Sequence, residues 1–252
     1  SDVLQMMLKS AKLSQHMTEE NKLKNNSILD AMFKAGAHFG YVKSRRNASV
    51  ASFIFGSKNK TDIIDLEKTA EQLEKAKSFI SGIAKAGKQV LFVGGKSEAK
   101  SFVKDGAMSI DMPYVSGRWI GGTLTNTVEI KKRVAKFEDL ERQKEKGELM
   151  KYTKKERVLI DREIANLEEM FLGIVGMKEL PKALFVIDPK KDNIAVSEAK
   201  KMGIPVVALA NTDCNIKEID YPIVANDSST TSISFFMNEM INSYKSGKIA
   251  KV

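Results

Sequence analysis

Residues 183–189 read Ala-Leu-Phe-Val-Ile-Asp-Pro, and this stretch decides the class of fold. Its first five residues are all apolar, and Asp188-Pro189 ends the run. A short apolar run without polar alternation, bounded by turn residues, is typical of a strand buried on both faces of a parallel sheet. Residues 89–93 (QVLFV) and 205–209 (PVVAL) repeat the pattern.

Helical segments separate these strands. We expect helices over residues 97–106, 194–202 and 228–246, and shorter strands at 53–55, 112–115 and 223–224. Strands that alternate with helices, several of them apolar throughout, predict an α/β fold. Its sheet is expected to be mostly parallel, with helices on both faces.

Residues 128–175 interrupt this alternation with a highly charged segment. Apolar residues recur at helical spacing on two stripes, which are Ile130, Val134 and Phe137, and then Ile160, Ile164, Leu167, Phe171 and Ile174. This heptad spacing predicts an inserted antiparallel coiled-coil hairpin, with arms on the order of 30 Å long. Thr153 and Glu156 predict a capping box at the start of the second arm. The alternative is a solvated helix pair that only braces the domain.

These patterns divide the chain into four parts. We expect a polar N-terminal extension over 1–27, an α/β domain over 28–127 and 176–246, the hairpin over 128–175, and a basic tail over 247–252. No run approaches the roughly 18 apolar residues of a membrane span, and the first 30 residues lack an apolar signal core. The single cysteine, Cys214, excludes an internal disulfide and favours a reducing, cytoplasmic location.

The positive charge is concentrated near the N-terminal end. The net charge is +9, and residues 31–61 hold six of the basic residues and no acidic one. Lys43, Arg45 and Arg46 lie beside the aromatic residues Phe39 and Tyr41, a combination that suits phosphate contact and base stacking. We therefore expect this stretch to bind RNA, and the alternative is a generic solubilising surface. Arg118-Trp119, in a glycine-rich loop, is a smaller candidate, although a lone Trp also suits the core.

Residues 94–97 contain no complete nucleotide-binding motif. Gly95-Lys96-Ser97 resembles the end of a phosphate-binding loop, but position 90, where that motif needs glycine, is Val. The chain has two histidines, which nearly excludes a histidine-based triad or metal site. A metal shared by His38, Asp188 and Asp213 stays open, with ordinary packing roles favoured. We expect no enzyme and no cofactor; the alternative is a nucleotide-binding α/β enzyme with a coiled-coil insertion.

Several motifs in fixed order together resemble a known family. They are GAHFG (36–40), FIFG (53–56), IIDLEKT (63–69), RWIGGTLTN (118–126), LPKALFVIDP (180–189), GIPVVA (203–208) and IDYPI (219–223). From residue 28 to residue 245 the chain is similar to the bacterial-type ribosomal protein S-two family, found in the small ribosomal subunit.

The resemblance implies a flavodoxin-like α/β domain with a coiled-coil insertion and a structural role on the ribosome. It implies binding of small-subunit rRNA and of neighbouring ribosomal proteins, including the mRNA-binding protein S-one where the organism has it, without catalysis. The rRNA-facing residues that it suggests are Lys43, Arg45, Arg46, Lys58, Lys60, Lys96, Arg118 and Trp119. Because the hairpin holds 12 basic and 11 acidic residues, we expect the α/β body to contact rRNA, and the hairpin to contact proteins and to make a few RNA backbone contacts.

Overall fold

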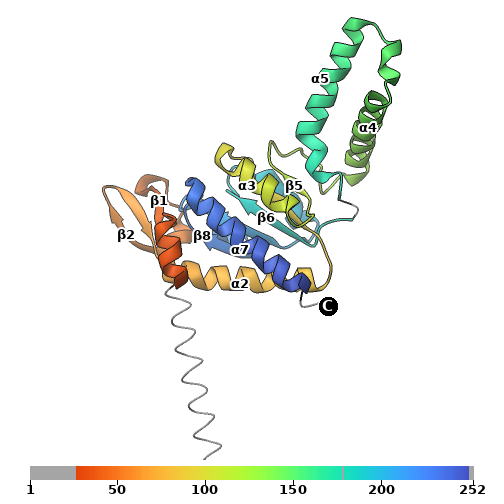
Figure 1. Ribbon diagram of the computed structural model, residues 1–252. Helices are drawn as coiled ribbons and strands as arrows, with labels where there is room; N and C mark the ends of the chain where they lie inside the picture. Colours follow the sequence, from red (N-terminus) through yellow and green to blue (C-terminus); the bar gives the residue numbers. More distant parts are fainter. Residues whose placement is uncertain (1–26, 178, 250–252) are drawn as a thin grey trace, which may run out of the picture.

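A five-stranded parallel sheet forms the centre of the protein (Figure 1). The computed structural model describes residues 27–177 and 179–249. The sheet has the order β5-β4-β6-β7-β8. Its strands are β4 (Val90–Val93), β5 (Tyr114–Val115), β6 (Ala183–Ile187), β7 (Val206–Ala210) and β8 (Tyr221–Val224). The three apolar runs predicted as core strands are therefore confirmed as β4, β6 and β7, at the middle of the sheet.

Helices cover both faces of this sheet, as predicted. On one face, Phe92 and Phe185 pack beneath α2 (Leu66–Lys85), α3 (Ser97–Met108) and α7 (Thr230–Ile249). On the other face, Leu91 and Leu184 share a second core with α6 (Asn193–Lys201). Since side chains alternate between the faces of a strand, a strand that is apolar at every position is the one that can serve two cores.

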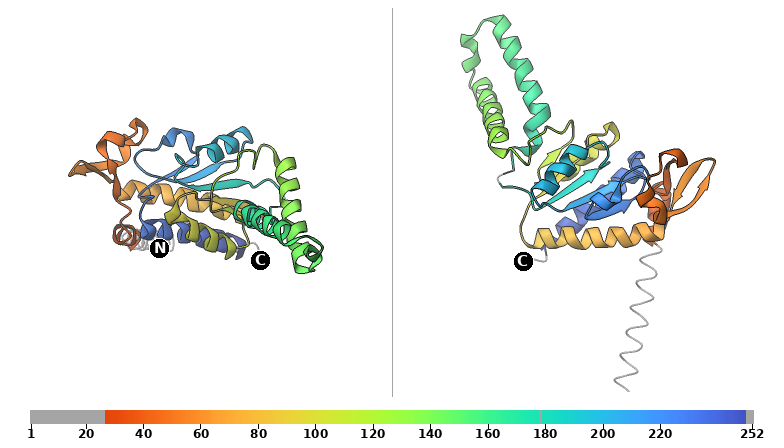
Figure 2. Two further views of the ribbon diagram at one scale, coloured as in Figure 1. Left: turned by 90° about the horizontal axis from the view of Figure 1, so that it is seen from above. Right: turned by 180° about the vertical axis from the view of Figure 1, so that it is seen from behind.

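Two helices replace the simple crossover between β5 and β6. They are α4 (Thr127–Glu145) and α5 (Lys154–Phe171), and together they project away from the body of the protein (Figures 1 and 2). Phe137, Ile164 and Leu167 are buried between or beneath them, so the predicted apolar stripes do face inward. The predicted capping box of Thr153 and Glu156 is confirmed at the start of α5.

Cross-helix ion pairs join the two arms along their length. Lys136 pairs with Glu163, and the Lys144 Nζ lies 2.9 Å from the Asp161 carboxylate. All four side chains are about half exposed, so these pairs contribute little to stability. They place opposite charges next to each other in a highly charged segment.

A second, smaller sheet lies at the opposite end of the body from α4 and α5 (Figure 1). It is antiparallel, with the order β1-β3-β2, and consists of β1 (Phe39–Val42), β2 (Ile54–Lys58) and β3 (Thr61–Ile64). The sequence predicted one short strand here, at residues 53–55, where the structure has three. The structure corrects this, because Asn59 and Lys60 adopt left-handed backbone angles and close a tight hairpin between β2 and β3.

The observed helices at the two ends of the chain differ slightly from the predicted domain boundaries. Residues 27–34 are helical, and α7 continues to Ile249, beyond the predicted end of the α/β domain at residue 246. The predicted N-terminal extension, apart from residue 27, and the last three residues of the predicted basic tail lie outside the described residues.

Candidate nucleic-acid interface

The carboxyl ends of the parallel strands, where α/β proteins usually bind their ligands, are covered by the first residues of the small sheet. Here the Tyr41 N–H donates to Thr212 Oγ1 at 2.9 Å, and the Asn47 N–H donates to the Thr212 carbonyl oxygen at 2.8 Å. A Cβ atom added to Gly40 would lie 2.6 Å from Thr212 Cγ2. The absence of a side chain at position 40 therefore lets β1 pack closely on the loop that follows β7.

Lys96 is held beneath this cover by two carboxylates. Its Nζ lies 2.8 Å from Asp188 Oδ2 and 2.7 Å from Asp227 Oδ2. Burial by itself lowers the pKa of Lys96, but the charges and hydrogen bonds of Asp227 and Asp188 together raise it above its ordinary value. Lys96, predicted to face rRNA, is thus an internal cation whose charge is already balanced.

The glycine loop before α3 is occupied by a third carboxylate. The Gly95 N–H donates to Asp192 Oδ2 at 2.9 Å, and an added Cβ at Gly95 would lie 2.8 Å from the same carboxyl group. Burial raises the pKa of Asp192 above its ordinary value. Because a carboxylate holds the place that a phosphate would take, the geometry does not support nucleotide binding at residues 94–97.

The three residues considered for a metal have separate surroundings. His38 stacks on Phe33, with ring centroids 4.5 Å apart, and burial lowers its pKa. The Asp213 carboxylate lies 2.9 Å from Lys190 Nζ, while Asp188 pairs with Lys96. Within the part of the chain that the structure describes, no cluster of three His, Cys, Asp or Glu side chains could hold a metal ion.

Four of the predicted RNA-facing residues are exposed on the small sheet and on the turn that follows β1. They are Lys43, Arg45, Lys58 and Lys60, and we call them the basic face. The Lys43 N–H donates to the Lys60 carbonyl oxygen at 2.8 Å. This bond brings the turn after β1 next to the turn between β2 and β3. The Arg45 guanidinium lies 5.8 Å from the centre of the Tyr41 ring. Among the described residues, none of the four side chains forms an ion pair.

Arg46, although it follows Arg45 directly, is only partly exposed and pairs with the buried Asp62. Its Nε donates to Asp62 Oδ2 at 2.7 Å, a second guanidinium nitrogen contacts Oδ1, and Ser57 Oγ also donates to Oδ1 at 2.8 Å. The Asp62 side chain is fully buried. The hydrogen bond from Arg46 lowers the pKa of Asp62, and Asp62 raises that of Arg46. This pair fixes the small sheet internally, so the proposed interface leaves Arg46 out.

Arg118 is exposed, but Trp119 beside it is only 6% exposed. The loop that contains them wraps around the carboxylate of Glu198 on α6. Oε1 accepts hydrogen bonds from the Trp119 indole at 3.2 Å and from the Gly122 N–H at 2.7 Å. Oε2 accepts from the Leu124 N–H at 3.0 Å and from the N–H and hydroxyl of Thr125, both at 3.2 Å.

These bonds explain the electrostatics of Glu198. Burial by itself raises the pKa of Glu198, but the donors of the loop lower it below its ordinary value. The motif RWIGGTLTN is therefore a carboxylate-binding loop within the protein. Trp119 is a structural residue in this conformation, and its ring is not presented for base stacking.

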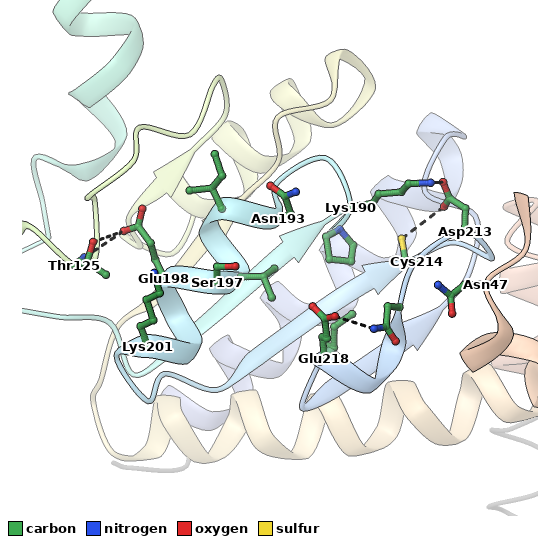
Figure 3. Close-up of a pocket in the computed structure, with 15 residues that line it drawn as sticks. Asn47, Thr125, Lys190, Asn193, Ser197, Glu198, Lys201, Asp213, Cys214 and Glu218 are labelled. Carbon is green, nitrogen blue, oxygen red and sulfur yellow. Dashed lines mark hydrogen bonds and ion pairs between the residues drawn. The ribbon is translucent and has the colours of Figure 1, made fainter.

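A cavity of about 730 Å³ lies between α6 and the loop after β7 (Figure 3). Its candidate nucleophile is Cys214, whose Sγ lies 3.6 Å from Asp213 Oδ1. Burial raises the pKa of this thiol, so the reactive thiolate is disfavoured. Asp213 is paired with Lys190, and Glu198 is held by its loop. The cavity, as lined by described residues, thus lacks an activated nucleophile with a base.

The comparison with known proteins decides the family. The sequence model for "Ribosomal protein S2" matches residues 32–247. The chain belongs to the ribosomal protein S2 family. The family predicted from the ordered motifs is thereby confirmed.

Three similar proteins are each named small ribosomal subunit protein uS2. The Spiroplasma citri protein is 45% identical over 215 residues, which are 85% of this chain and 60% of that protein. The Mesoplasma florum protein is 42% identical over 88% of this chain and 84% of its own length. The Coprothermobacter proteolyticus protein is 41% identical over 87% and 82%. This chain therefore spans less than two thirds of the Spiroplasma relative, but more than four fifths of the other two.

The sequence did not predict the structural roles of Asp62 and Glu198. Both are buried carboxylates that organise the segments holding Arg46 and Arg118. Over the described residues, no helix combines the length and apolar character that a membrane span requires.

Proposed function

We propose that this protein contacts small-subunit rRNA through the basic face, formed by Lys43, Arg45, Lys58 and Lys60. As a member of the ribosomal protein S2 family, it is a structural constituent of the small ribosomal subunit and not an enzyme. The observation that carries the proposal is the presence of four exposed cations at one small sheet, none of them in an ion pair with another described residue.

The local charge supports this assignment. Residues 31–61 contain no acidic residue, and the nearest carboxylate in the sheet, that of Asp62, is buried and neutralised by Arg46. The exposed cations therefore create a field that favours phosphate groups. Arg118, exposed in a loop on another part of the body, is proposed as a separate and weaker contact.

Charge reversal tests the proposal directly. The variant K43E/R45E should bind weakly to small subunits from which this protein has been washed out at high salt. Each lost phosphate contact should also flatten the dependence of log affinity on log salt by close to one unit. A matched control, K75E/K85E, makes the same charge change at exposed positions of α2. Equal binding by the two double variants would place the rRNA contact elsewhere.

The hairpin of α4 and α5 is proposed to be a coiled coil inserted into a flavodoxin-like domain. It is proposed to contact neighbouring ribosomal proteins, including the mRNA-binding protein S-one. Its near balance of 12 basic and 11 acidic residues favours protein contacts over a phosphate backbone. Val158 and Leu159, both about half exposed on α5, add apolar surface for such contacts. Replacing residues 129–174 by a short loop should keep rRNA affinity and remove protein neighbours from chemical crosslinks. Loss of rRNA binding in this variant would refute the division of roles.

A further inference from the structure

Phe55 is the most exposed large apolar side chain in the described part of the chain, at 81%. It lies in β2, on the small sheet that carries the basic face. Ile54 pairs with Ile64 and Gly56 pairs with Ile63, so Phe55 is the extra residue of a β-bulge. Bulges commonly redirect a side chain away from the regular alternation of a strand. The fold thus presents a whole aromatic ring to the surroundings at a fixed position.

The residue after Phe55 leaves room beside that ring. A Cβ atom added to Gly56 would meet no atom within 4 Å, and its φ is not in the left-handed region. Neither packing nor backbone angle within the described chain therefore requires glycine at position 56. A glycine inside a strand also occurs where a ligand approaches the backbone closely.

The charges near this open surface indicate the chemistry of the ligand. Lys58 is three residues from Phe55 along β2, about 10 Å in an extended strand. Lys60 follows at the turn, and both lysines are exposed without an acidic partner in the described residues. An exposed ring next to free cations fits a group that is planar on one side and anionic on the other. A nucleotide with an unpaired base has both properties, whereas duplex RNA presents few base faces.

We propose that Phe55 is a stacking residue for an unpaired rRNA base, with Lys58 and Lys60 contacting the adjoining phosphates. This inference rests on the proposed rRNA-binding function and adds the kind of RNA structure recognised. A protein partner is the competing occupant of the same surface, and the test below separates the two.

The test compares F55A, F55L and F55W in the full chain, binding to small subunits washed free of this protein, over a series of salt concentrations. Stacking predicts that F55A and F55L both bind roughly tenfold more weakly than wild type, while F55W stays within about threefold. The salt dependence should be unchanged, because no phosphate contact is lost. The fluorescence of the indole introduced by F55W should be quenched on binding, against the constant signal of buried Trp119.

Matched variants distinguish failure of the stacking proposal from failure of the proposed rRNA-binding function. M108A removes an exposed apolar side chain from α3 and should bind as wild type does. If K58E/K60E weakens binding but F55A does not, stacking is refuted while the rRNA-binding function stands. If F55L binds as tightly as wild type, the contact is simply apolar, and stacking on a base is refuted. If K58E/K60E and K43E/R45E both bind normally, the proposed function fails, and this inference fails with it.

Discussion

Replacing Glu198 by Gln tests whether one carboxylate holds the Arg118–Asn126 loop in place. Its two oxygens accept five hydrogen bonds from this loop, and the side chain is buried. An amide keeps one acceptor oxygen, but its NH₂ group then faces N–H donors that have lost their partner. A buried donor left unsatisfied costs about 1–3 kcal/mol, and the change strands at least two. We therefore expect E198Q to lose about 3 kcal/mol of unfolding free energy.

Two measurements follow this variant. For a protein of this size, about 3 kcal/mol corresponds to a decrease of about 6–12 °C in Tm by circular dichroism. Trp119 is the only tryptophan and is bonded to Glu198, so its emission should shift to the red in E198Q before global unfolding. The control E218Q alters an exposed carboxylate on the rim of the same cavity and should change Tm little. Unchanged Tm and emission in E198Q would show that apolar packing, not the carboxylate, holds the loop.

Three further predictions concern the small sheet and the covered crevice. R46A should lose about 2–4 kcal/mol of unfolding free energy in urea, because it leaves the buried Asp62 carboxylate without its partner. The control R45A should lose less than about 0.5 kcal/mol. Equal losses in the two variants would contradict the pairing. G40A should destabilise by about 1–3 kcal/mol, since its Cβ would overlap Thr212, while G56A should be almost neutral in the same assay. Because the pKa of Asp192 is raised in the folded protein, ionisation of this carboxyl group lowers the stability of wild type as pH rises through that pKa. D192N should therefore equal or exceed wild type in Tm at pH 7. This difference in Tm should vanish below about pH 4, where Asp192 is protonated in both the folded and the unfolded state. A wild-type protein more stable than D192N at pH 7 would refute this sign.

The sequence predicted the large sheet well because its signal is local. β4, β6 and β7 are short apolar runs flanked by glycine, proline or aspartate, and each was located to within a residue or two. The helices α4 and α5 were equally readable from apolar spacing and the Thr153 capping box. The small sheet was not, because its strands mix polar residues and glycine with apolar residues, and its ladder is broken by bulges.

The partners of the predicted site residues were harder to predict, because ion pairs join positions far apart in the chain. Nothing near Lys96 indicates Asp227, and nothing near Trp119 indicates Glu198. Signals for the buried acids did exist. Glu198 occupies the same helical stripe as Ala195 and Ala199, and Asp62 shares a strand with the buried Ile64. An acid on an apolar stripe has to be paired inside the fold.

The contact between Tyr41 and Thr212 has a consequence for synthesis of the chain. The two residues are 171 positions apart, and Asn226 also donates to the Ala37 carbonyl oxygen. During translation, the N-terminal segment therefore cannot dock until β7 and β8 have left the ribosomal exit tunnel. Such long-range closure is slow compared with local helix formation. The small sheet with the basic face is therefore synthesised early but reaches its native docked position only late in folding.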